Sequence, residues 1–475
     1  MRLARVAALG AASTLVGCAL VSLDGLTGGD AGPDGAVTVR SDGAPADGTI
    51  AADAGDPDAE KEAGKDATGD ASTPPGDAAA DGTSDGAMAG SPVSIVSVGA
   101  VTAPSGAAQQ GHLVWTAGTQ QWWLFYVDAA DPTALQATAS SDFHAWSAGG
   151  TLTLPGPPSD GRNIAAWAGT AAGQDVVHLG VSVALSSTDR RHLHVRARPA
   201  GGALEFDPLV VLGAPYLDLS GLDPDGPATA LGTDGTLLDT SGWFEGPDGG
   251  ATGNEYGWSS TAPDPGGAWT PAFDDAQVVG QVPGYVNARA VVPLPGGSVL
   301  ALWEAGDVDP DPTNVAFAVE SGATWGPGGD VFSASTQDPN DWGACALGAA
   351  VHAVRHTSGG VWEHRVWTGT PTADGGTTFV DGGTIAALAT PAAAGVVVLC
   401  DATRVHVFAI APDAGNPIRT TSWDGSAWSA WSDAVAAPGQ RTWLTGTVTP
   451  TGSIALAWTE SAASPVAIAG ALVAP

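Results

Sequence analysis

A pattern that recurs about every fifty to sixty residues is the feature that most restricts the fold of this chain. In each copy, a small or polar turn leads to an aromatic residue and then to a short apolar or β-branched run. The aromatic residues are Trp146, Phe206, Trp269, Trp325, Phe379 and Trp428, at separations of 60, 63, 56, 54 and 49 residues. A unit of this size cannot bury an apolar face alone, so the copies are expected to stack on one another.

Each interval also contains three short strand patterns separated by turn residues, as at 112–116, 122–127 and 135–140. No long stretch has the 3.6-residue periodicity of a helix, which indicates an all-β fold. Four strands per repeat of this length is the blade of a β-propeller.

The two ends of the repeat region predict how the ring closes. After the sixth repeat the chain has three further strand patterns, at 443–448, 453–458 and 466–472, while the apolar segment at 93–101 precedes the first repeat without a partner. Joining them gives a seventh blade made of one N-terminal and three C-terminal strands, and it removes exposed sheet edges. The alternative is six blades with an extra terminal hairpin.

The N-terminus has the features of an export signal. Two arginines in residues 1–5 precede an uncharged apolar stretch that is too short to span a bilayer. This apolar stretch is followed by Cys18, and residues Leu15, Val16, Gly17 and Cys18 together resemble the lipobox of bacterial lipoproteins. The resemblance implies cleavage after residue 17, lipidation of Cys18 and, since Ala19 rather than Asp follows, the outer membrane of a Gram-negative bacterium, facing the periplasm or the cell surface. The alternative is an ordinary secretory signal with an incidental cysteine.

Residues 18–91 are expected to form a disordered stalk between this signal (residues 1–17) and the folded domain (residues 92–475). Between residues 24 and 90 there are thirteen Asp and two Glu against three basic residues, and no aromatic residue precedes Trp115. Such a segment has too little apolar surface to offset the entropy of ordering. The net charge of −34 excludes nucleic acid as a partner, leaves the lipid as the only membrane contact, and suits a monomer that stays soluble.

The turns before the repeat aromatics resemble the Asp-box of sialidase-like propellers. Residues 318–325 and 262–269 keep the acid, glycine and tryptophan positions, whereas 140–146 and 422–428 are one residue short. The segment 423–431 is also similar to the tryptophan-rich repeat of some seven-bladed bacterial lectins. We expect the boxes to be structural, with the acid capping turn amides and the tryptophan packing between sheets.

A ligand site is expected at the axial mouth where each outer strand leads into the next inner strand, because loops from every blade converge there. The polar and aromatic residues at these entries are His112, Arg162, Asn163, Asp225, Asn287, Arg289, Asp341, Trp342, Arg441 and Trp443. Guanidinium groups can bind carboxylates or sugar hydroxyls, and tryptophan can stack on a sugar ring. The alternative is that these groups pair with one another as a satisfied polar network.

These features predict a binding module for a glycan, or for an envelope or extracellular protein. The sialidase resemblance implies the alternative of a glycoside hydrolase or polysaccharide lyase, but the four tyrosines and the absence of a clear acid or arginine triad assign no catalytic residue. No cofactor or metal is expected. The acidic run 307–311 alternates acids as a calcium loop does, but it lacks the glycine and glutamate of such a loop, so a solvated loop is favoured and calcium is the alternative. No metal-ligand spacing is found among His352, His356, His364 and His406.

Cys345 and Cys400 are an even pair that invites a disulfide, although their assignment to different blades argues against one.

Overall fold

The structure is a computed structural model, and the regular secondary structure in the part it describes consists of strands. The residues described are 90–96, 112–128, 130–158, 164–186, 190–216, 228–231, 237–245, 252–260, 270–274, 286–295, 298–306, 312–321, 324–325, 328–332, 335–336, 342–357, 361–371, 377–388, 395–460 and 467–474. Within these ranges there is no helix of the length and hydropathy that crossing a membrane would need. Cys18 and the predicted stalk lie outside the described residues.

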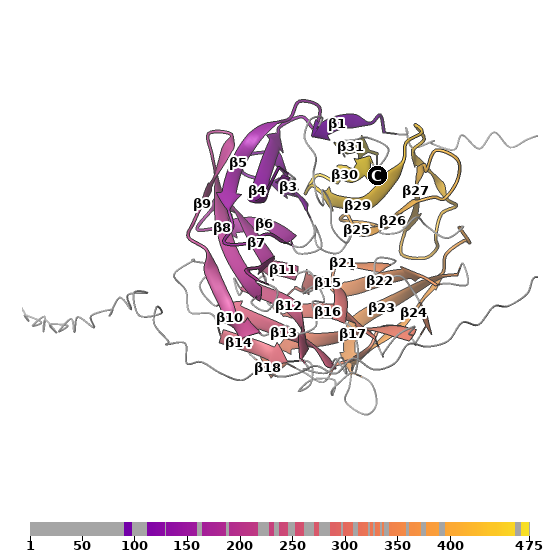
Figure 1. The fold of residues 1–475 in the computed structure, drawn as a ribbon. Helices are drawn as coiled ribbons and strands as arrows, with labels where there is room; N and C mark the ends of the chain where they lie inside the picture. The colour runs from indigo at the N-terminus through magenta and orange to yellow at the C-terminus, as the bar shows by residue number, and fades with distance from the viewer. Residues whose placement is uncertain are drawn as a thin grey trace, which may run out of the picture. The chain divides into compact units, whose positions relative to one another are not determined.

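The described strands form seven antiparallel sheets, so the predicted β-propeller fold is confirmed (Figure 1). The first sheet contains β2 (Leu113–Thr116), β3 (Gln121–Asp128), β4 (Asp131–Ser140) and β5 (Ser147–Thr153). The second contains β6 (Ile164–Ala171), β7 (Gln174–Ala184), β8 (Arg190–Ala200) and β10 (Val210–Tyr216), with β9 (Ala203–Phe206) also paired to β8. The third contains β11 (Ala228–Leu231), β12 (Leu237–Glu245), β13 (Thr252–Ser260) and β14 (Thr270–Asp274).

The remaining sheets follow the same order from the inner to the outer strand. The fourth contains β15 (Val286–Pro293), β16 (Val299–Gly306) and β17 (Pro312–Ser321), with the short strands β18 (Thr324–Trp325), β19 (Gly329–Asp330) and β20 (Ser335–Thr336) paired to β17. The fifth contains β21 (Trp342–Leu347), β22 (Ala350–His356), β23 (Trp362–Pro371) and β24 (Thr377–Thr384). The sixth contains β25 (Val396–Cys400), β26 (Val405–Ile410), β27 (Ile418–Trp423) and β28 (Ser432–Val435).

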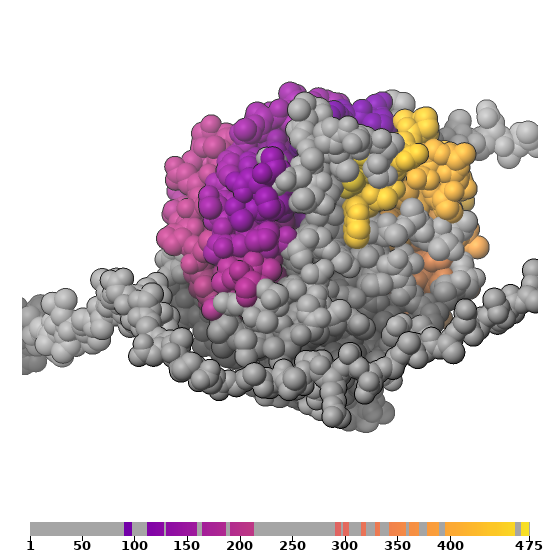
Figure 2. Space-filling model, in the orientation of Figure 1, coloured from indigo at the N-terminus to yellow at the C-terminus, as the bar shows by residue number. Residues whose placement is uncertain are grey.

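The seventh sheet joins the two ends of the domain as the sequence predicts. It contains β29 (Arg441–Val448), β30 (Ile454–Glu460) and β31 (Ala467–Val473), and its outer strand is β1 (Val93–Val96). Val93 pairs with Gly470 and Ser94 with Ala469. Figure 2 shows the two ends of the described region, coloured indigo and yellow, next to each other.

The inner strands follow one another in a closed ring. Successive contacts run from β2 to β6, β11, β15, β21, β25 and β29, and β29 contacts β2 again. Separate apolar clusters fill the spaces between the first and second sheets, the fourth and fifth, the fifth and sixth, and the sixth and seventh. A further cluster, which includes Ile95, Trp122, Phe143 and Ile468, fills the space between the closing sheet and the first sheet. The core is therefore distributed between blades.

Phe379 occupies a different place from Trp146, Phe206 and Trp428 relative to its outer strand. Trp146, Phe206 and Trp428 precede the outer strands β5, β10 and β28, as the repeat predicts. Phe379 instead lies inside the outer strand β24, where its ring packs edge-on against Phe317 at 5.0 Å.

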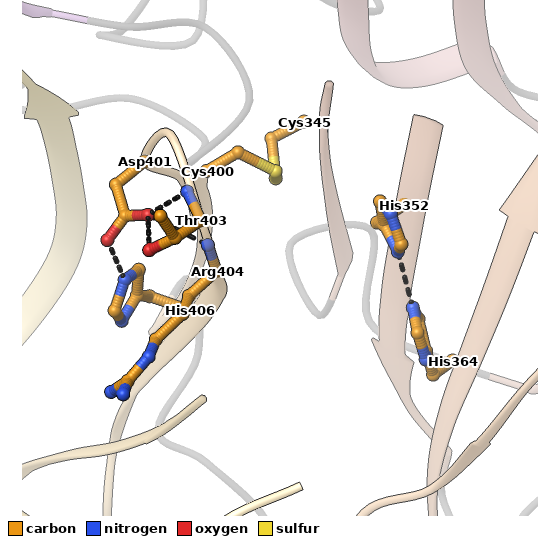
Figure 3. The surroundings of a disulfide bond; sticks show 8 residues. All are labelled: Cys345, His352, His364, Cys400, Asp401, Thr403, Arg404 and His406. Atoms are coloured by element: carbon orange, nitrogen blue, oxygen red, sulfur yellow. Dashed lines mark hydrogen bonds and ion pairs between the residues drawn. A yellow bond between two sulfur atoms is a disulfide. The ribbon is translucent and has the colours of Figure 1, made fainter. Parts of the chain in front are cut away.

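A disulfide joins the inner strands of the fifth and sixth sheets, which settles the open question about the cysteines (Figure 3). Cys345 on β21 and Cys400 on β25 have their Cα atoms 5.6 Å apart. Their positions on different blades do not separate them, because inner strands approach closely at the axis. A Cβ on Gly343 would lie 2.9 Å from the Val398 side chain, so the absence of a side chain there permits this approach.

Two buried histidines pair at the interface between the fifth and sixth sheets. Nδ1 of His364 lies 2.7 Å from the Gly382 carbonyl oxygen and therefore donates to it, which leaves Nε2 to accept from Nδ1 of His352 at 3.0 Å. Both rings pack against Trp423 of the neighbouring sheet. Burial lowers the pKa of His352 to about 4, with a further contribution from His364, and burial lowers the pKa of His364 to about 4 despite the opposing effect of the Gly382 carbonyl.

We expect the double variant Cys345→Ser/Cys400→Ser to lose stability. The bridge spans 55 residues, and closing a loop of that size contributes about 4 kcal/mol through the entropy of the unfolded chain. Urea denaturation of the two proteins measures this difference, and peptide mapping without reductant should recover both cysteines in one linked peptide. Recovery of two free thiols from the native protein would contradict the bridge.

We also expect the propeller to lose stability as the pH falls from about 6.5 to about 4. In that window the unfolded chain protonates both histidines while the folded chain keeps them neutral, so the linkage destabilises the fold by on the order of 3 kcal/mol for each histidine. Thermal unfolding of wild type and His352→Gln/His364→Gln across this range tests the assignment. The variant should show a shallower pH dependence, and an unchanged slope would assign the acid sensitivity to other groups.

Candidate functional site

A cavity of about 610 Å³ lies where the inner strands meet. Its walls come from inner strands of the first, second, fourth, fifth, sixth and seventh sheets: β2, β6, β15, β21, β25 and β29. Small residues are common in these walls, among them Ala166, Ala168, Ala344 and Gly446. Their small side chains leave the axis hollow, and the volume is in the range of small-molecule pockets.

The cavity reaches solvent at the end of the axis where the inner strands end. Its lining residues Ala117, Thr170, Ala402 and Pro450, each at or just after the end of an inner strand, are exposed. The residues at which these strands begin, such as Leu113 and Ile164, are buried. The open end is therefore bordered by the tight turns that join inner strands to second strands. The sequence prediction placed the site at the opposite end.

Two half-buried tryptophans on neighbouring inner strands provide the aromatic surface of the cavity. Trp115 lies on β2 and packs against Trp122 at 4.6 Å, and Trp167 lies on the adjacent β6. The Trp167 ring lies over Gly169, where a Cβ would approach the ring to 2.1 Å. Gly169 lies two residues after Trp167 on the same face of the strand, and its lack of a side chain therefore lets the Trp167 indole take this orientation.

Asp175 is a buried carboxylate in the cavity wall that ties the second sheet to the first. It is 8% exposed, and its oxygens accept hydrogen bonds from the Gly118 amide at 2.9 Å, the Thr119 amide at 2.5 Å and the Thr119 hydroxyl at 2.9 Å. The described donors are all uncharged. These bonds hold the β2–β3 turn at the cavity entrance, and they leave the negative charge of the carboxylate uncompensated.

Asp401 is the second carboxylate in the wall, and it begins the β25–β26 turn (Figure 3). One oxygen accepts from the Thr403 amide at 2.6 Å, the Thr403 hydroxyl at 2.9 Å and the Arg404 amide at 2.8 Å, and the other lies 2.8 Å from Nε2 of His406. Burial acts to raise its pKa, but the bonds from His406, Thr403 and Arg404 outweigh this and lower the pKa to about 2. The carboxylate is therefore ionised throughout the physiological range and is unsuited to donating a proton.

Two lining hydroxyls are available to a ligand. Thr170, at the end of β6, is exposed, and Thr447, on β29, is half-buried. Neither hydroxyl has a hydrogen-bond partner among the residues that the structure describes. The nearby Thr449 differs, because its hydroxyl lies 2.9 Å from that of Thr451 and accepts from the Ser453 amide.

Of the ten residues predicted from the sequence, the structure describes the side chains of His112, Trp342, Arg441 and Trp443, and none of these four lines the cavity. Arg162, Asn163, Asp225 and Asp341 lie outside the described residues. Asn287 and Arg289 lie on β15 and Trp443 on β29, where Trp443 is half-buried with φ at 57°.

The other three predicted residues are buried in the protein. Trp342 is fully buried in the cluster between the fourth and fifth sheets. His112 is also fully buried, and its backbone amide donates to the Thr445 hydroxyl at 3.4 Å.

Arg441, at the start of the inner strand β29, shows that an arginine at this position need not face a ligand. Its side chain is 1% exposed, donates to the carbonyl oxygens of Asn416 and Ala437, and lies over the Trp458 ring. Its Nε is 3.8 Å from Glu460. The guanidinium therefore ties the seventh sheet to the β26–β27 turn and to the segment after β28, through partners that are not among the other predicted entry residues.

The two short acidic turns are structural, as predicted. Asp142 accepts from the amides of His144 and Ala145, and Asp424 accepts from the amides of Ser426 and Ala427. Trp431 donates to the Ala386 carbonyl oxygen of the neighbouring sheet at 2.8 Å. The tryptophan-rich segment 423–431 thus packs between blades.

Sequence reasoning missed Trp115, Trp167, Asp175 and Asp401. A weak signal was present, because Asp175 directly follows the tight turn after the inner strand β6, and Asp401 begins the turn after the inner strand β25. The sequence Trp-x-Gly at 167–169 also indicates an indole ring that lies across its own strand. Neither signal identifies which end of the axis is open.

No family model matches this sequence, and no curated protein sequence matches it. Solved structures do match. An α-L-arabinofuranosidase of Fusarium graminearum, solved with an iminosugar inhibitor, has 13% identity and a TM-score of 0.43, covering 80% of this chain and 98% of that one. The fucose-binding lectin of Aleuria aurantia has 12% identity and a TM-score of 0.42, covering 70% and 97%. A polysaccharide lyase has 9% identity and a TM-score of 0.47, covering 80% and 91%.

Proposed function

We propose that this propeller is a carbohydrate-binding module whose axial cavity takes a saccharide of one or two rings. The observation that carries the proposal is the pair of half-buried indoles, Trp115 and Trp167, on neighbouring inner strands of a small-molecule-sized cavity. A sugar ring has an apolar C–H face that suits an indole, and hydroxyls at its edge that need hydrogen-bonding partners. Thr170 and Thr447 supply such hydroxyls in the wall.

The chemistry of the wall favours binding over hydrolysis or elimination. A glycosidase needs one carboxyl group that stays protonated near neutral pH, so its pKa must be raised. Asp401 has the opposite property, and Asp175 is engaged by three hydrogen bonds from the β2–β3 turn. These carboxylates organise the entrance of the cavity.

The export signal and the stalk give the module a location in this proposal. Lipidation of Cys18 would anchor the protein in the outer membrane of a Gram-negative bacterium, with the acidic segment 18–91 as spacer. The Cys345–Cys400 disulfide supports export, because such bridges persist in oxidising compartments and are rare in the cytosol. A saccharide of the envelope or of the surroundings is then within reach.

We expect Trp167→Ala to weaken saccharide binding at least tenfold, about 1.4 kcal/mol, since the stacking surface is lost. Gly169→Ala should also weaken binding, because the added methyl group displaces the Trp167 ring. A glycan array followed by titration calorimetry measures this. Trp146→Ala, which removes a half-buried indole from the β4–β5 turn, is the matched control. Equal losses in all three variants, or a loss only in Arg289→Ala, would place the site elsewhere.

The anchor is tested separately. In a Gram-negative host, the full-length protein should incorporate a labelled fatty acid and partition into the detergent phase of Triton X-114, whereas Cys18→Ser should do neither. Secretion of unlabelled wild-type protein would show an ordinary signal peptide and refute the anchor while leaving the saccharide site untouched.

A further inference from the structure

The charged side chains described in the cavity wall are all acidic. Asp175 and Asp401 line it, and no described lining residue is Lys, Arg or His. Arg404, on the same turn as Asp401, is exposed and does not line the cavity. Both carboxylates are largely buried, with Asp175 at 8% and the Asp401 side chain at 8% exposure.

The hydrogen bonds to Asp401 keep that carboxylate ionised, and the described donors to Asp175 are uncharged, so the charge of the two groups is not cancelled by a cation that lines the cavity in the described residues. Amides and hydroxyls stabilise the anionic form but carry no net positive charge. Among the described residues, His406 is the single titratable group that contacts either carboxylate. It bonds Asp401 but is not itself one of the residues that line the cavity. In a hollow bounded by apolar strands, such charges act over a longer range than on an open surface, because less water screens them.

We infer that the axial cavity discriminates by charge: it takes saccharides that are uncharged or carry a protonated amine, and it rejects uronates and sialylated sugars. This inference rests on the proposed saccharide site and names the class of sugar that the site accepts. A sugar carboxylate entering between Asp175 and Asp401 meets like charge and no described cation. An ammonium group is attracted both by the carboxylates and by the faces of Trp115 and Trp167.

The discrimination disagrees with one of the two ligand types that the sequence predicted from its arginines. Arginines at the opposite end of the axis were expected to bind either carboxylates or sugar hydroxyls. Arg441 is instead engaged by carbonyl oxygens and Glu460, so its charge is used inside the protein. The selectivity of the cavity thus follows from which charges face it, and the total number of arginines does not decide it.

The test compares matched oligosaccharides of one length and linkage that differ in a single group: a neutral hexose, the corresponding hexosamine and the corresponding hexuronate, in gluco and galacto series. Titration calorimetry is run with the full chain at about 20 and about 500 mM salt. We expect affinity in the order hexosamine, hexose, hexuronate at low salt. The spread should shrink at high salt, since the Debye length falls to a few ångströms.

Substitutions of the two aspartates test whether their charges cause the selectivity between sugars. Asp401→Asn and Asp175→Asn should each raise the hexuronate-to-hexose affinity ratio at least about threefold. The control Glu205→Gln removes one charge from an exposed position on β9 and should leave the ratio nearly unchanged. Thermal unfolding shows whether the turns survive, and the salt series on wild type stands without the variants.

The outcomes separate the two proposals. Binding of none of the sugars would overturn the saccharide site and the selectivity with it. Binding with equal or higher affinity for hexuronates, or with a salt-independent order, would overturn the selectivity and leave the saccharide site standing. An equal response of Glu205→Gln would assign the effect to the net charge of the whole chain and overturn the role of the two aspartates.

Discussion

The pairing of β1 with β31 is the interaction on which the rest of the structure depends. Each sheet is four strands or a little more, and its faces are covered by its neighbours. The pairing of Val93 with Gly470 closes the ring, and the cluster around Phe143 and Ile468 then buries the faces that an open array would expose. Without closure, two apolar faces and two sheet edges would meet water.

Closure also determines the geometry of the axis, where the inner strands meet side by side. Gly343 permits the close approach of β21 to β25, and the Cys345–Cys400 bridge makes that approach covalent. Elsewhere, alanines and glycines face the axis and leave a hollow. Small residues thus permit the close packing of β21 against β25, and small residues elsewhere around the axis leave space for the cavity.

Four described aspartates that accept hydrogen bonds from turn amides fall into two groups, distinguished by where their turns lie. Asp142 and Asp424 cap turns on the way to the outer strands, in contact with solvent. Asp175 and Asp401 hold turns at the rim of the axis with similar backbone hydrogen bonds, but their charge faces an enclosed space. The same local chemistry therefore fixes a turn in the first case, and in the second case it also sets the electrostatic character of a binding site.

Much of the fold could be read from the sequence because strands and tight turns are local. The spacing of the aromatics, the short strand patterns and the lone apolar segment at 93–101, of which Val93–Val96 forms β1, were sufficient to predict the sheets and their closure. The acidic turns at Asp142 and Asp424 could also be predicted, because the donors and the acceptor lie within three residues of one another.

Only the tertiary structure decided where the described cavity reaches solvent, which described polar residues line it and which cysteines meet. His112 and Arg441 stand at strand entries as the sequence predicts, yet packing between sheets buries them. Cys345 and Cys400 belong to different repeats, and only the convergence of inner strands brings them together. Local patterns specify each blade, whereas the site depends on distances between blades, and those are set by how the faces of the sheets pack around the closed ring.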